Sequence, residues 1–312
     1  MRLTPAGSRA WRVARILAAA TAIAFLVAAF LSTWDRSQGL ALPALPALLL
    51  AGLVTAAGLV SALIGWTVLL GGAPVRRIAS GFLLAQAGKY VPGGLWQVVG
   101  QIDAARRAGV PLARATAAFA VFTLLQVATG GLFGATLALA SVPAPVRVAA
   151  ASGAALVALA DRRWMTWLLA RLRPAALSHL PPRRAIVSAF ALLTVSHLAG
   201  AVAFVALLAG AGAGWQPAAA AAAIVAWTVG FLALPFPSGL GVREAVLVAA
   251  LSGRIDPAVV LTAAVAQRLV ALVVEGAMIL LARLLLAGGP GGEVADGHGR
   301  GRDQRDVAQG GG

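Results

Sequence analysis

Two short breaks in an otherwise apolar chain carry the residue types that could bind an anion. The first is Lys89-Tyr90-Val91-Pro92-Gly93-Gly94-Leu95-Trp96-Gln97, and the second is Pro237-Ser238-Gly239-Leu240-Gly241-Val242-Arg243-Glu244. Lys89 and Tyr90 are the only lysine and the only tyrosine in the chain. Paired Gly/Pro breaks at matching places in two halves of a membrane protein indicate a binding site. These breaks are therefore the candidate functional site.

The chemistry that the breaks predict is anion binding at the start of a helix. A helix that begins inside a membrane presents unpaired N–H groups and about half a positive charge at its N-terminus. Lys89 lies just before one such predicted start and Arg243 just after the other. The competing interpretation is that the prolines only kink helices and that the cations extend to the interface. The predicted contacts to a phosphate headgroup are Lys89, Tyr90, Pro92, Gly93, Gly94, Trp96, Gln97, Pro237, Gly239, Gly241, Arg243 and Glu244.

A second set of charges lies in the last apolar segment. Arg268 follows Pro257 by 11 residues and is therefore placed near the bilayer middle, where an unpaired charge is costly. Glu275 lies on the same helical face, roughly 10 Å further along the axis, too far to pair with Arg268. We predict Glu244 as the partner of Arg268 and Arg243 as the partner of Glu275. The two pairs serve either as salt bridges across the bundle or as part of a substrate pathway.

Other chemistries have little support in the sequence. The chain has no cysteine, which excludes disulfides, thiolate catalysis and cysteine metal sites. Its histidines, His179, His197 and His298, lie far apart and lack the spacing of metal ligands. We predict no catalytic residue, no metal and no cofactor, and do not expect an enzyme. His197 is interpreted as a hydrogen-bonded core residue.

The composition is that of an all-α polytopic membrane protein. The chain is 60% hydrophobic and 11% charged, whereas soluble domains are about 25% charged. We predict a transmembrane domain over residues 1–287, with about seven or eight transmembrane helices, followed by a disordered, Gly-rich and charged tail over residues 288–312. Apolar segments long enough to cross a bilayer are found at 13–31, 42–70, 112–141, 144–160, 184–210, 216–234 and 257–286.

The net charge of +15 is interpreted as a signal of orientation in the membrane and not of nucleic-acid binding. Arginines concentrate before the first span and in the loop before the fifth, which predicts a cytoplasmic N-terminus. A cleaved signal peptide is the alternative, although no clear cleavage site follows the first apolar segment. These arginines are Arg2, Arg9, Arg12, Arg15, Arg162, Arg163, Arg171, Arg173, Arg183 and Arg184.

The breaks also predict an internal repeat with re-entrant or broken helices. Each break is followed, after 19 or 20 residues, by a proline that opens a long helix, and the two units are 145 residues apart. The repeat is either parallel or inverted. Arginines on both flanks of the first break suggest that residues 78–105 enter the membrane and return. The arms 78–88 and 95–105 are each roughly 16 Å long, about half of a hydrocarbon core.

The second break leaves two topologies open. Residues 240–252 either form another half-helix returning to the cytoplasm or complete a crossing with the segment before them. The first option gives seven spans and an external C-terminus, and the second gives eight spans and an internal one.

The first break resembles a signature of the lysylphosphatidylglycerol synthase transmembrane-region family of flippase-like membrane proteins. The second break is similar to that family's Pro-Gly-Gly-Leu-Gly and Arg-Glu signature, and Gln267-Arg268 matches a pair in its last helix. The resemblance covers roughly residues 10–286. Phe122, next to Thr123, stands where the family often has a glutamate. No aminoacyl-transferring domain follows the membrane region in this sequence, so we do not expect the chain to synthesise lysyl-lipid itself.

The resemblance implies a membrane module that moves lipids between leaflets. The leading hypothesis is therefore a protein that binds or translocates an anionic phospholipid or lipid-linked substrate, with membrane lipids as its partners. One alternative is a non-catalytic scaffold of a separate membrane enzyme. Another is an integral membrane transferase, for which Glu244 is the best candidate base and Asp103 a poor second.

Overall fold

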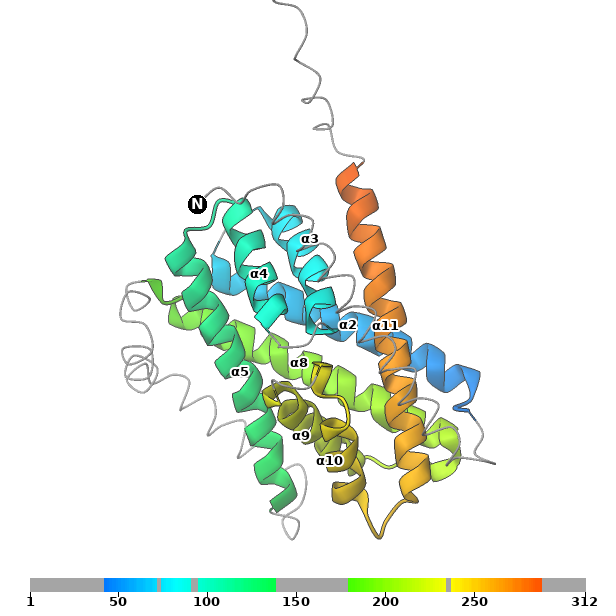
Figure 1. Cartoon of the computed structure of the whole chain (residues 1–312). Coiled ribbons are helices and arrows are strands. Elements are labelled where there is room, and N and C mark those ends of the chain that lie inside the picture. The colour runs from blue at the N-terminus through cyan, green and yellow to red at the C-terminus, as the bar shows by residue number, and fades with distance from the viewer. Residues whose placement is uncertain (1–41, 72–73, 91–94, 139–178, 234–236, 288–312) are drawn as a thin grey trace, which may run out of the picture.

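The structure is a computed structural model that describes residues 42–71, 74–90, 95–138, 179–233 and 237–287. These residues form a helical bundle without strands (Figure 1). Four of the described helices are long and apolar enough to cross a membrane: α2 (Leu45–Leu70), α5 (Leu112–Ala138), α8 (Arg183–Leu208) and α11 (Pro257–Ala287). The predicted class of α-helical membrane protein is confirmed at this level. The predicted segments 13–31 and 144–160 and the predicted tail lie outside the described residues.

The outward faces of the long helices are apolar. Leu53 on α2 and Val273 on α11 are 70% and 71% exposed, and other large aliphatic side chains extend the same faces. Continuous exposed apolar surface of this kind is unfavourable in water and indicates a membrane or protein interface. Prolines open the helices where a missing N–H costs nothing, as Pro257 does for α11.

Among the described helices, α2 and α8 make the most extensive contact with each other, and they run antiparallel. At one end the N–H of Ala44 donates to the carbonyl of Gly210 (3.2 Å). Further along, Ser61 Oγ donates to the carbonyl of Leu192 (2.7 Å). A higher residue number on the α2 side is paired with a lower residue number on the α8 side. The two helices therefore point in opposite directions.

The first break folds as a helical hairpin. Its arms are α3 (Val75–Gln86) and α4 (Leu95–Arg107), and the 3₁₀ turn η1 (Ala87–Tyr90) extends α3. The arms touch closely, because a Cβ at Gly81 would lie 2.3 Å from the Cβ of Ala104. Helices of 12 and 13 residues are about 18 to 20 Å long, too short to cross a bilayer. The predicted pair of short arms is confirmed.

The second break forms another hairpin. Its arms are α9 (Ala219–Leu232) and α10 (Val242–Leu251), joined through the 3₁₀ turn η4 (Pro237–Gly239). Gly239 has a left-handed φ of 64° and lies so close to Gly230 that a Cβ would be 2.5 Å from its Cα. The structure does not confirm the predicted span 216–234 as a full crossing, since α9 has 14 residues and α10 packs back against it. The two options for residues 240–252 both stay predictions, and the packing of α10 on α9 favours the returning half-helix.

The predicted repeat is visible in the order of the helices. A long helix, two short arms and a second long helix occur as α2–α3–α4–α5 and again as α8–α9–α10–α11. Since α2 and α8 are antiparallel, the two units have opposite directions, and the repeat is inverted. Figure 1 shows the α3–α4 pair in the upper part of the bundle and the α9–α10 pair in the lower part. The turns η1 and η4 nevertheless touch, so the two hairpins meet at their tips.

Exposed arginines gather at one end of the bundle. At this end of the bundle α2 ends and α3 begins, and α4 returns to the same end. The helix α8, which is antiparallel to α2, begins there as well. This is the distribution that the positive-inside rule requires of one membrane side. The arginines are Arg76, Arg77, Arg106, Arg107, Arg183 and Arg184.

Candidate functional site

The two breaks and the middle of α11 form one polar cluster, here called the junction. The hairpin tips bring Lys89, Tyr90 and the η4 turn together, and α11 runs past both tips. We define the junction as Lys89, Tyr90, Ser238, Gly239, Arg243, Glu244, Gln267, Arg268 and Glu275. The sequence predicted all of these as site or intramembrane residues except Ser238 and Gln267.

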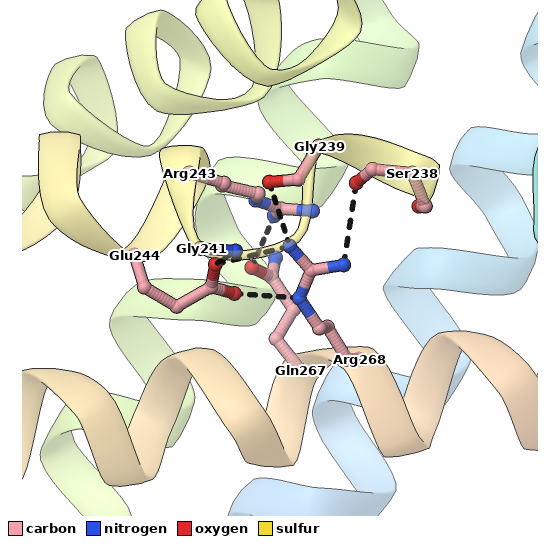
Figure 2. Close-up of polar contacts among 7 residues, drawn as sticks. All are labelled: Ser238, Gly239, Gly241, Arg243, Glu244, Gln267 and Arg268. Atoms are coloured by element: carbon pink, nitrogen blue, oxygen red, sulfur yellow. Dashed lines mark hydrogen bonds and ion pairs between the residues drawn. The ribbon is translucent and has the colours of Figure 1, made fainter. Parts of the chain in front are cut away.

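Arg268 pairs with Glu244, as predicted. Its Nε lies 2.6 Å from Glu244 Oε1, and its Nη2 lies 3.2 Å from Oε2 (Figure 2). The guanidinium also donates to the carbonyls of Ser238 (3.2 Å) and Gly239 (3.3 Å). Arg268 is 8% exposed, so these contacts neutralise a buried charge and occupy most of its donors. Its positive charge is therefore not free to bind another anion.

The backbone of η4 explains the geometry of this pair. Ser238, Gly239 and Gly241 all have positive φ values, of 51°, 64° and 79°. This left-handed path turns two carbonyls toward α11, and glycine adopts it without the steric cost that other residues meet. The left-handed conformation of Ser238 and Gly239 thus orients the two carbonyls that accept from Arg268.

Glu244 also caps α10, in whose first turn it lies. Its Oε2 accepts from the N–H of Gly241 at 2.8 Å, in the manner of a capping box. The N-terminus of α10 was predicted to bind an anion from outside the chain. The chain's own carboxylate thus occupies one of the N–H groups at this start, and the binding of an outside anion there stays a prediction.

Glu275 contacts the tip of the first hairpin. It forms an ion pair with Lys89 Nζ and accepts from the hydroxyl of Tyr90 at 3.0 Å. The predicted partner, Arg243, is therefore wrong. Glu275 lies two turns beyond Arg268 on α11, so each hairpin tip is attached to the same helix by its own ion pair.

Arg243 is the exception among the junction cations. Its Nη2 donates to Oε1 of Gln267 (2.6 Å), and Gln267 donates in turn to the carbonyl of Gly200 (2.6 Å). Among the residues that the structure describes, no carboxylate forms an ion pair with Arg243. Its partner is a neutral amide, so the junction keeps one uncompensated positive charge.

The remaining predicted residues lie elsewhere or outside the description. Gln97 donates to Gln86 at 3.2 Å and thereby links the two arms of the first hairpin. Trp96 lies in the first turn of α4. Pro237 begins η4, but its side chain lies outside the described part of the structure, as do Pro92, Gly93 and Gly94 entirely.

Comparison of the chain with protein-family models, curated proteins and solved structures found no significant match. The family resemblance of the two breaks therefore stays a prediction. Within the described ranges, no group of His, Asp and Glu residues could hold a metal ion.

Sequence reasoning missed the bridging role of Gln267. Its amide connects Arg243 to the backbone of α8, a contact that depends on how α10, α11 and α8 pack. The available signal was a glutamine in the middle of a 31-residue apolar helix, next to a buried arginine. A polar side chain in such a place needs a partner on another helix.

Proposed function

We propose that this chain is a bacterial plasma-membrane protein that binds an anionic lipid headgroup at the junction and translocates the lipid between leaflets. The observation that carries the proposal is the uncompensated charge of Arg243. The resemblance to flippase-like membrane proteins points the same way.

The charges of the junction favour an anion at Arg243 and at no other cation there. Glu275 neutralises Lys89 and Glu244 neutralises Arg268, whereas Arg243 has a neutral partner. An unpaired charge inside a membrane protein is costly, and a bound phosphate would remove that cost. The planar guanidinium is suited to bidentate contact with phosphate oxygens.

The inverted hairpins suggest how access could alternate. Inverted repeats with broken helices place a substrate site near the membrane midplane, and rocking of one repeat exposes the site to one side at a time. Here each hairpin tip is attached to α11 by a separate ion pair, Lys89–Glu275 or Arg268–Glu244. Release of one tip while the other stays attached would open the junction toward one leaflet.

The transferase alternative is less well supported by the junction. Glu244, its best candidate base, is bound to Arg268 and to the N–H of Gly241. A general base needs a carboxylate that can reach its substrate, and this one is already engaged.

The test is lipid exchange in vesicles that contain the purified protein. Fluorescent phospholipids with different headgroups are added to both leaflets, and the accessible fraction is followed after a quencher is added outside. We expect faster exchange of an anionic class, abolished in Arg243→Ala and partly kept in Arg243→Lys. Arg107→Ala is the control, because this exposed arginine pairs with Asp103 away from the junction.

Thermal unfolding of each variant shows whether it is folded. If folded Arg243→Ala exchanges lipid at the wild-type rate, the proposal is wrong. If the folded wild-type protein exchanges no lipid at all, the scaffold hypothesis takes its place.

A further inference from the structure

Gln267 and Arg268 are neighbours on α11, and both reach the start of α10 (Figure 2). Arg268 pairs with the carboxylate of Glu244, whereas Gln267 accepts from Arg243 through a neutral amide. Glutamine and glutamate have nearly the same shape, so a carboxylate at position 267 could reach the same guanidinium. The amide at this position therefore decides whether Arg243 is neutralised.

Two neighbours fix the direction of the Gln267 amide. The carbonyl of Gly200 can only accept, so Nε2 faces it and donates at 2.6 Å. The guanidinium of Arg243 can only donate, so Oε1 faces it, also at 2.6 Å. A carboxylate could not satisfy both contacts, because it has no hydrogen to give to the carbonyl. Gln267 is 6% exposed, so little water can reach the amide in place of either partner.

The junction keeps one positive charge because position 267 is neutral. Each of its two carboxylates is paired with a cation, and the third cation, Arg243, has only the amide of Gln267. A glutamate at position 267 would bring the number of carboxylates to three and the net charge of the junction to zero. The charged groups counted here are Lys89, Arg243, Arg268, Glu244 and Glu275.

Arg243 can still meet a ligand while Gln267 holds it. The bond to Gln267 uses Nη2, and the other N–H groups of this guanidinium have no partner among the described residues. Arg243 also lines a cavity of about 100 Å³ between α5, α8 and α9, so there is open space beside its side chain. Gln267 thus positions the guanidinium without covering it.

We propose that Gln267 sets the charge specificity of the junction. It positions Arg243 and leaves the charge of Arg243 to the ligand, so that anionic lipids are accepted in preference to zwitterionic ones. This assignment rests on the proposed function, because Arg243 is the anion contact in both. In Gln267→Glu the new carboxylate pairs with Arg243 and repels an anionic headgroup. The ammonium group of a zwitterionic headgroup, in contrast, can lie against that carboxylate.

The test compares lipid exchange in vesicles that contain the full-length protein. The fluorescent probes have the same acyl chains and are phosphatidic acid and phosphatidylglycerol, which are anionic, and phosphatidylethanolamine, which is zwitterionic. We expect the wild-type protein to exchange at least one anionic probe about 10-fold faster than the zwitterionic one, and Gln267→Glu to exchange neither anionic probe faster, because like charges side by side at a binding site repel strongly.

Two further variants separate charge from packing. Gln267→Met has a similar volume and forms neither hydrogen bond, so we expect slower exchange in which an anionic probe stays the fastest. A residue that only packs α11 against α8 would give the same result in Gln267→Met and Gln267→Glu. Gln216→Glu is the control for the added charge, because this exposed glutamine donates to the carbonyl of Ala213 outside the junction. It should leave the exchange of all three probes unchanged.

Chemical unfolding in detergent gives a second readout. If the new carboxylate pairs with Arg243, Gln267→Glu should cost less stability with Arg243 present than in an Arg243→Gln background. An equal cost in the two backgrounds, or a Gln267→Glu protein that does not fold, would show that the carboxylate does not neutralise Arg243 and would overturn the assignment.

The failure of this assignment is distinct from the failure of the proposed function. If folded Gln267→Glu keeps the anionic preference of the wild type, or Gln267→Met loses it to the same extent, Gln267 does not set the specificity and the proposed function stands. If the folded wild-type protein exchanges none of the three lipids, both proposals fail.

Discussion

The ion pair between Arg268 and Glu244 links the start of α10 to the middle of α11 through two hydrogen bonds, of 2.6 and 3.2 Å. Each partner has a further task. Arg268 also holds the carbonyls of the η4 turn, and Glu244 caps α10 through the N–H of Gly241. The pair is therefore the point at which the second hairpin is attached to the bundle.

We predict that breaking this pair from either side is strongly destabilising. Glu244→Gln leaves the buried guanidinium of Arg268 without its counter-charge. Arg268→Met leaves the carboxylate of Glu244 without its counter-charge. Each variant should lose about 3 kcal/mol of unfolding free energy. The measurement is chemical unfolding in detergent, combined with the double variant. A double-variant loss equal to the sum of the two single losses would show that the residues do not interact.

At the other tip, we predict that Lys89 matters more for stability than Tyr90. Lys89→Met leaves Glu275 buried with one neutral donor, which should cost about 3 kcal/mol. Tyr90→Phe removes a single neutral hydrogen bond of 3.0 Å and should cost about 1 kcal/mol. Unfolding of the two variants under the same conditions compares these losses. An equal or larger loss for Tyr90→Phe would contradict the ion pair between Lys89 and Glu275.

Much of the fold could be predicted from local sequence signals. Long apolar segments defined the spanning helices, and the arms around Pro92 were short enough to indicate a hairpin. The span predicted at 216–234 is not confirmed, because the apolar character of a segment does not show where the chain turns back. The contact of Gly230 with Gly239 and the packing of α10 against α9 show that the chain turns back.

The candidate site was predictable residue by residue but not pair by pair. The burial of Arg268 followed from its place in an apolar helix, and Glu244 was the correct partner since both lie in the second repeat. The partner of Glu275 comes instead from the first hairpin, 186 residues away from it in the chain. The spacing of residues along the chain does not predict this pair, because the pair depends on how the two inverted units pack against each other.

We predict that Gly239→Ala disrupts the second hairpin far more than Gly253→Ala. Both glycines have left-handed φ values, of 64° and 73°, so alanine is strained at either position by about 1 kcal/mol. A Cβ at Gly253 meets no other atom within 4 Å, whereas one at Gly239 would lie 2.5 Å from Gly230. The measurement is the melting temperature of each variant. Because both variants share the strain of a left-handed alanine, the difference between their melting temperatures reports the cost of the close contact with Gly230. Equal losses in the two variants would mean that α9 and η4 do not touch there.

Finally, we predict that single cysteines will report two sides of the membrane in the order set by the inverted repeat. The native chain has no cysteine, so each variant carries one thiol. Arg76, Arg107 and Arg184 lie at the arginine-rich end, while Gln216 and Arg254 belong to the turns that flank the second hairpin. A membrane-impermeant maleimide added to intact cells should label Gln216→Cys and Arg254→Cys. The other three should react only after the membrane is opened, because positive loops stay in the cytoplasm. Labelling of Gln216→Cys and Arg254→Cys from opposite sides would show that α9 and α10 together cross the membrane, contrary to the hairpin.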